Sequence, residues 1–385
     1  MENNIEKIEN YLEYFKHYFL NLSKFRKTRI KKLLIENQIC PLKIDENGMP
    51  IDNTKTDVDN FVLDSFLSTD KAILLFQKNE LFQNYKYSIF YKILNENLND
   101  IKSNILGKKD LFFDIDSEIE EFNIFKDNNA TENAWNIKKT YYSINDEKIY
   151  LKIPLGIEKF IANFYGNVKT KMFFLCIIDL ENKIMEVRYE GLTQPFKTNQ
   201  EFYLSLEEKA VNFIKYELKL KLQNLDLQFI PKEIETLKNM GYKIVRRAAE
   251  FSDAGSAALG SNNENMLPYI DDLKIFLELK LKEFEEDTTE YKVASEMKRE
   301  ILEFFNEKED ESSYTNIILK INNYQTHFNY FYDDRCVVQH EYMSSNNDDG
   351  RGDYVKGIIL QLERQFNKVG NERKWYSQLR KIFIF

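Results

Sequence analysis

An unbroken apolar run, Met172 to Ile178, constrains the fold of this chain more than any other stretch. A strand made of such a run buries both of its faces, so it must lie inside a sheet. Residues 179–183 interrupt the run with turn-compatible side chains, among them Asn182, which tolerates a positive φ. Residues 184–189 then alternate in the period-2 pattern of a half-buried strand. The sequence therefore predicts a hairpin whose second strand lies nearer the sheet edge.

Helical and extended patterns complete a chain of the α+β class. Local sequence patterns predict one long helix or a helix pair at 5–36, and helices at 59–68, 78–105, 157–165, 205–222, 231–239, 269–286, 290–306 and 354–367. Short apolar and aromatic stretches predict strands at 139–143, 148–153, 242–247, 326–332 and 335–342. Small and polar residues predict a loop at 251–261, a linker at 306–313 and a second loop at 344–353.

These elements fall into three predicted regions. Residues 1–106 form a helical N-terminal region, and residues 107–262 form a domain with a mixed or antiparallel sheet around the hairpin at 172–190. Residues 263–385 form a helical C-terminal region with a small hairpin of its own.

The composition excludes several classes of protein. Apolar residues make up 43% of the chain and its formal net charge is −9, which excludes global disorder and an overall electrostatic attraction to nucleic acid or anionic membranes. Three widely spaced cysteines without a CxxC pair indicate a reducing compartment. The first residues are not signal-like, and no apolar run reaches the ~20 residues of a membrane helix. We therefore expect a cytoplasmic protein without membrane contact.

Two basic segments and one pair of arginines are the predicted nucleic-acid contacts. Cations lie among aromatic residues in 24–32 and 368–381, and two arginines close a predicted strand beside a Gly/Ser loop. Such cations can hold a phosphate backbone. The alternatives are the solvated face of a lysine-rich helix and ordinary salt bridges. The candidate residues are Lys24, Arg26, Lys27, Arg29, Lys31, Lys32, Arg246, Arg247, Arg373, Lys374, Arg380 and Lys381.

A second, acidic pattern supports an enzymatic alternative. Asp271, Asp272, Glu278 and Lys280 are the nearest match to the acids and lysine of a metal-dependent nuclease, and Gly260-Ser261 ahead of two aspartates is a partial nucleotidyltransferase pattern. Either enzyme would use Mg²⁺ or Mn²⁺. However, the segment has helical spacing, and two adjacent aspartates point to opposite sides of a strand. We expect no other cofactor.

His327 and His340 would face each other if the predicted strands 326–332 and 335–342 form a hairpin, which would allow a metal site with a nearby carboxylate. The alternative is a pair of half-exposed strand histidines, and we assign no metal ligands.

We expect a non-catalytic component of a bacterial or phage complex. It would bind a protein partner, and nucleic acid would contact its local basic segments. Abundant lysine, asparagine and isoleucine are the pattern of AT-rich codons, and this composition is the basis for placing the protein in an antiphage defence or mobile-element system. The alternative is a divergent metal-dependent nuclease or nucleotidyltransferase.

Overall fold

The fold is α+β, as the sequence predicts. In this computed structural model the chain forms two compact units, residues 1–223 and 224–385. Predictions for 1–18 and 343–385 lie outside the described residues. The structure describes most of residues 19–41, 57–79, 85–95, 99–114, 140–161, 166–192, 199–251, 255–260, 270–310, 313–321, 324–331 and 335–342.

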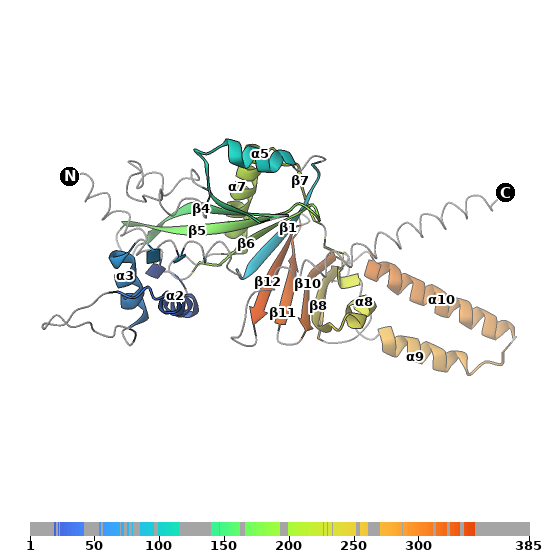
Figure 1. Cartoon of the computed structure of the whole chain (residues 1–385). Coiled ribbons are helices and arrows are strands. Elements are labelled where there is room, and N and C mark those ends of the chain that lie inside the picture. Colours follow the sequence, from blue (N-terminus) through green and yellow to red (C-terminus); the bar gives the residue numbers. More distant parts are fainter. Residues whose placement is uncertain are drawn as a thin grey trace. The chain divides into compact units, whose positions relative to one another are not determined.

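The first unit is built on a sheet that contains the predicted hairpin (Figure 1). Its strand order is β2-β3-β4-β5-β6-β1, and the neighbours are antiparallel except for the parallel pair β2 and β3. A short strand, β7, pairs with β1. The strands are β1 (Tyr87–Ile93), β2 (Phe112–Asp114), β3 (Thr140–Asn145), β4 (Lys148–Ile161), β5 (Gly166–Asp179), β6 (Ile184–Tyr189) and β7 (Leu222–Asn224).

The predicted hairpin is confirmed, but two of its details differ from the prediction. Strand β6 lies between β5 and β1 rather than near an edge, and all of its residues except Arg188 are buried. The turn takes its positive φ at Lys183 (54°) and not at Asn182. Asn182 instead donates its backbone N–H to Asp179 Oδ1 at 2.8 Å. The Asp179 side chain therefore stabilises the turn at Asn182, and Asn182 itself does not need a positive φ.

Helices cover the first sheet and form a second small core beside it. Helix α7 packs on β4 with α5 alongside (Figure 1). Asn199 caps the start of α7 by accepting the N–H of Phe202 at 3.2 Å, and the helix ends at Lys219 in the left-handed conformation. Helices α2 and α3 bury Phe19, Phe61 and Phe66 between them. The bounds are α2 (Lys24–Glu36), α3 (Val58–Ser68), α5 (Asn99–Gly107) and α7 (Gln200–Leu218).

The second unit contains an antiparallel sheet with the strand order β12-β11-β10-β8-β9. Its apolar face holds Ile317, Phe328 and Val338, all fully buried. Gly241 follows α8 with a φ of 87°, a conformation that favours glycine at a helix end. The elements are the 3₁₀ turn η3 (Ile230–Lys232), α8 (Ile234–Asn239), β8 (Lys243–Phe251), β9 (Gly255–Gly260), β10 (Ser313–Ile321), β11 (Tyr324–Tyr330) and β12 (Cys336–Tyr342).

Helices α9 (Ile270–Leu281) and α10 (Thr289–Asp310) form an antiparallel helical hairpin, drawn in orange tones in Figure 1. Both follow the predicted helices, although α10 runs to Asp310 and takes up part of the predicted linker.

Three sequence predictions of local structure are wrong. Strand β1 interrupts the predicted helix 78–105, which resumes only as α5. Because β1 is buried on both faces, it is a nearly continuous apolar run, and such a run matches the spacing of a helix as well as that of a strand. The predicted helix 157–165 overlaps the end of β4, which pairs with β5 as far as Ile161. The predicted loop 251–261 contains β9, whose small residues pair with β8. Partner strands decide the conformation in the last two cases.

Candidate functional site

Helix α2 directs three of its predicted nucleic-acid-binding cations into the protein. Arg26 is 7% exposed, and its Nη2 lies 3.4 Å from Glu190 Oε2 while its guanidinium lies 5.0 Å from the centre of the Tyr85 ring. Lys31 Nζ lies 5.1 Å from the centre of the Phe61 ring. These are the geometries of an ion pair and of cation–π contacts.

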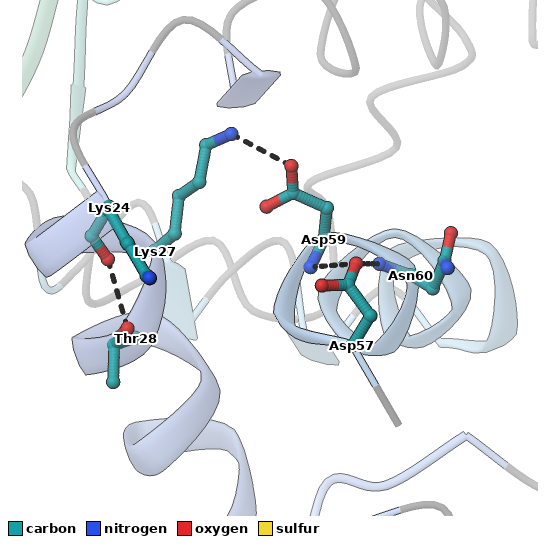
Figure 2. A network of polar contacts seen from close by, with 6 residues as sticks. All are labelled: Lys24, Lys27, Thr28, Asp57, Asp59 and Asn60. Carbon is teal, nitrogen blue, oxygen red and sulfur yellow. Dashed lines mark hydrogen bonds and ion pairs between the residues drawn. The ribbon is translucent and has the colours of Figure 1, made fainter. Parts of the chain in front are cut away.

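The third inward cation joins α2 to α3. Lys27 Nζ lies 2.9 Å from Asp59 Oδ2, in the first turn of α3, and Figure 2 shows this contact. The preceding Asp57 caps α3 by accepting the backbone N–H groups of Asp59 and Asn60 at 3.1 and 3.3 Å. Part of the basic segment therefore serves the α2–α3 contact. The remaining cations, Lys24, Arg29 and Lys32, are exposed or half-buried, and their contact with nucleic acid stays a prediction.

The two predicted phosphate-binding arginines of β8 lie on opposite faces of the second sheet. Arg247 is 1% exposed and pairs with Ile317 of β10 and Leu259 of β9, so it lies on the apolar face. Arg246 is exposed, and its row continues through Ile318 of β10. Only Arg246 of this pair is at the surface. The other predicted cations, Arg373, Lys374, Arg380 and Lys381, lie outside the described residues.

The acidic candidates of the enzymatic alternative lie on helix α9, with Asp271 next to Asp272. Asp272 and Glu278 are exposed, and Glu278 Oε1 lies 3.5 Å from Lys298 Nζ of α10. Lys280 pairs with Glu283 at 2.7 Å. On a helix, Asp272 and Glu278 lie six residues apart and therefore on different sides, so they do not form the alternating row of a nuclease strand. Within the described part of the chain, no group of three His, Cys, Asp or Glu residues could hold a metal ion.

The two strand histidines do not face each other. His340 pairs with Thr326 and His327 pairs with Gln339, so their side chains leave the sheet on opposite faces. His340 is buried, and His327 Nε2 contacts Gln325 Nε2 at 2.9 Å.

The interior of the first unit holds several polar groups. Glu186 accepts hydrogen bonds from Arg188 at 2.7 and 2.8 Å and from Ser88 Oγ at 2.8 Å. On the other face of the sheet, the hydroxyl of Tyr91 donates to the buried Glu207 at 2.5 Å. These contacts join β1, β6 and α7, and they are consistent with a structural role for both carboxylates.

Burial and electrostatics suppress the acidity of two groups near Glu207. Burial raises the pKa of the Cys176 thiol well above its ordinary value, and the Glu207 carboxylate raises it further. Burial also raises the pKa of Tyr189, against a smaller opposing effect of the hydrogen bond from Gln200. A thiol held in its protonated form is a poor nucleophile. Cys176 therefore lacks the properties of a catalytic nucleophile.

This thiol chemistry gives a testable result. Cys40 is exposed, whereas Cys176 and Cys336 are buried. At pH 8 we expect a thiol-reactive chromophore to label one cysteine per chain rapidly, and the other two only when the protein opens or unfolds. The change Cys40→Ser should abolish the rapid phase. Two rapid labels in the wild-type protein would contradict the burial of Cys176 or Cys336.

The largest concentration of exposed apolar side chains lies on the α9–α10 hairpin. Six of them, each more than half exposed, form what we call the hairpin patch: Ile275, Phe276, Leu279, Val293, Met297 and Phe304. A different, half-buried stripe that includes Leu273 and Leu277 makes the contact between the helices. Each helix therefore has one apolar stripe for its neighbour and a second one open to solvent.

Phe276 of α9 and Met297 of α10 open on the same side of the hairpin. Ile275 and Leu279 extend the exposed stripe of α9 to the side that is turned away from α10. On α9, Phe276 comes one residue before the half-buried Leu277, and on α10, Met297 comes one residue before the half-buried Lys298. Equal offsets on two antiparallel helices place the side chains on the same side of the pair. An apolar surface of this kind marks an interaction site.

Sequence reasoning identified both helices but missed this surface. The signal was present, because Ile275, Phe276 and Leu279 lie off the stripe that Leu273 and Leu277 define. A helix with apolar residues on two sides can bury both sides only against two neighbours. For α9, helix α10 is one such neighbour and covers one side.

No known protein family matches this chain, and no curated protein is similar to it. Among the described residues, no helix combines the length and the apolar character that crossing a membrane requires.

Proposed function

We propose that this protein is a non-catalytic subunit that binds a protein partner through the α9–α10 hairpin. The observation that supports the proposal is the hairpin patch, six large apolar side chains that are each more than half exposed on one pair of helices. Large apolar groups exposed on a helical pair favour contact with a further helix or helical pair.

Contact with nucleic acid is a second part of the proposal. Arg246 is exposed on the polar face of the second sheet, and His327 and Gln339 lie in the same cross-strand row. Lys24 and Lys32 are exposed on α2. Cations at these positions can hold phosphates, and such binding weakens steeply with added salt. The placement in a defence or mobile-element system remains a prediction from composition.

The nuclease or nucleotidyltransferase alternative also remains untested. Its residues Asp272 and Glu278 lie on an exposed helix, and Glu278 contacts a lysine of α10. A magnesium- or manganese-dependent activity that is lost in an Asp272→Ala, Glu278→Ala double variant would favour this alternative over the proposed role.

Purification of the tagged full-length protein from its native host tests the proposal. We expect the wild-type protein to retain a partner in fixed stoichiometry, and Met297→Lys to reduce the amount recovered at least tenfold because it places a charge in the middle of the patch. The matched control is Leu67→Lys, which changes a leucine on α3 that is also more than half exposed. Equal recovery with both variants would refute the role of the hairpin.

A further inference from the structure

The hairpin accounts for most of the net negative charge of the chain. Residues 270–310 contain 14 acidic and 7 basic side chains, a net charge of −7 against −9 for the whole sequence. Several of the lysines and arginines are already engaged within the hairpin, as in the pairs Lys280–Glu283, Lys298–Glu278 and Arg299–Glu296. The surplus of carboxylates therefore faces solvent.

Some of these carboxylates lie close to the hairpin patch. On α9, Asp272 lies one turn before the stripe of Ile275, Phe276 and Leu279. Glu283, which pairs with Lys280, lies one turn after it. Both are exposed. Residues three or four positions apart on a helix lie on the same side, so each carboxylate lies at an end of the apolar stripe.

Helix α10 also carries carboxylates along its exposed stripe. Glu290 precedes Val293 by three residues, and Glu300 lies between Met297 and Phe304 along the same stripe. Both glutamates are exposed. The hairpin therefore presents exposed apolar residues with carboxylates at the ends of the α9 stripe and along the α10 stripe.

We propose that the partner contacts this surface with an amphipathic helix whose apolar stripe is bordered by lysine or arginine. This inference rests on the proposed function and specifies the chemistry of the partner. Apolar contact supplies the buried area, while the opposite charges set the orientation and raise the association rate. Two other occupants are disfavoured by the same carboxylates: a second copy of the chain would bring one hairpin of charge −7 against another, and an anionic membrane would repel it.

Two synthetic helical peptides test the charge requirement. Each has about 20 residues, a length at which isolated helices begin to form. Both carry leucine at helical spacing; one has lysine at the remaining positions and the other has glutamate. We expect the full-length protein to bind the leucine–lysine peptide at least tenfold more tightly by fluorescence anisotropy. Equal affinity for both peptides, or tighter binding of the leucine–glutamate peptide, would overturn the inference.

Three variants separate specific docking from general attraction between charges. Met297→Ala with Phe304→Ala keeps every charge and should weaken binding of the leucine–lysine peptide at least tenfold, whereas Tyr216→Ala, which truncates an exposed aromatic residue of the first unit, should leave it unchanged. Glu290→Lys with Glu300→Lys should shift the preference toward the leucine–glutamate peptide. Undiminished binding by the Met297→Ala, Phe304→Ala variant would overturn the inference.

The remaining outcomes identify other occupants. A dimer in sedimentation equilibrium that Met297→Lys dissociates would assign the patch to a second copy. Peptide binding that appears only after removal of residues 368–385 would assign it to that basic segment of the same chain. Either result overturns the inference. If neither peptide binds, yet Met297→Lys still abolishes recovery of the native partner, the charge inference fails while the proposed function stands.

Discussion

Replacing Glu186 by alanine should lower the free energy of unfolding of the first unit by about 3–5 kcal/mol. The side chains of Glu186 and Arg188 are only 5% and 11% exposed, and Glu186 accepts three hydrogen bonds from Arg188 and Ser88. Its removal leaves the Arg188 guanidinium buried without its carboxylate. That cost exceeds the strength of the original contact, because both charges were already withdrawn from water.

Thermal unfolding monitored by circular dichroism measures this effect. A loss of 3–5 kcal/mol lowers the midpoint of a unit of this size by roughly 6–20 °C. The double change Glu186→Leu, Arg188→Met removes both charges and should recover most of the loss. The control, Glu283→Ala, breaks the Lys280–Glu283 pair, whose side chains are 53% and 61% exposed, and should cost about 0–1 kcal/mol. Equal effects of Glu186→Ala and Glu283→Ala would contradict the buried ion pair.

The Glu186–Arg188 pair explains why the sequence pattern predicted β6 too close to the sheet edge. Glu186 and Arg188 alternate with apolar residues, and alternation is typical of a strand with one face in water. In the structure the two charged residues satisfy each other and Ser88, so the polar face is buried as well. Sequence periodicity cannot distinguish a polar residue that faces water from one that faces a buried partner on the next strand.

The continuous apolar run 172–178 and the well-spaced helices of the second unit were predictable, because their patterns arise within one segment. Strand β9 was not, since the small residues of 255–260 become a strand only through pairing with β8. The structural environment of the predicted nucleic-acid-binding residues also depends on contacts that are distant in sequence. Residues 24–32 were a visible basic cluster, but the burial of Arg26 depends on Glu190 and Tyr85, which are distant in sequence.

The adjacent arginines of β8 should respond to alanine substitution in opposite ways. Arg247 is 1% exposed on the apolar face that also holds Ile317 and Phe328, so Arg247→Ala leaves a cavity and should lower the stability of the second unit by about 2–5 kcal/mol. Arg246 is exposed on the opposite face, and Arg246→Ala should change stability by no more than about 0.5 kcal/mol.

The binding measurement separates the two roles further. If Arg246 holds a phosphate, Arg246→Ala should weaken binding of the folded protein to single-stranded nucleic acid and reduce the dependence of the affinity on salt by about one counterion. Arg247→Met fills much of the buried volume without a charge and should retain the binding of the wild-type protein at a temperature where both are folded. Weaker binding with Arg247→Met but not with Arg246→Ala would assign the phosphate contact to the buried arginine, and it would require the apolar face of this sheet to open when nucleic acid binds.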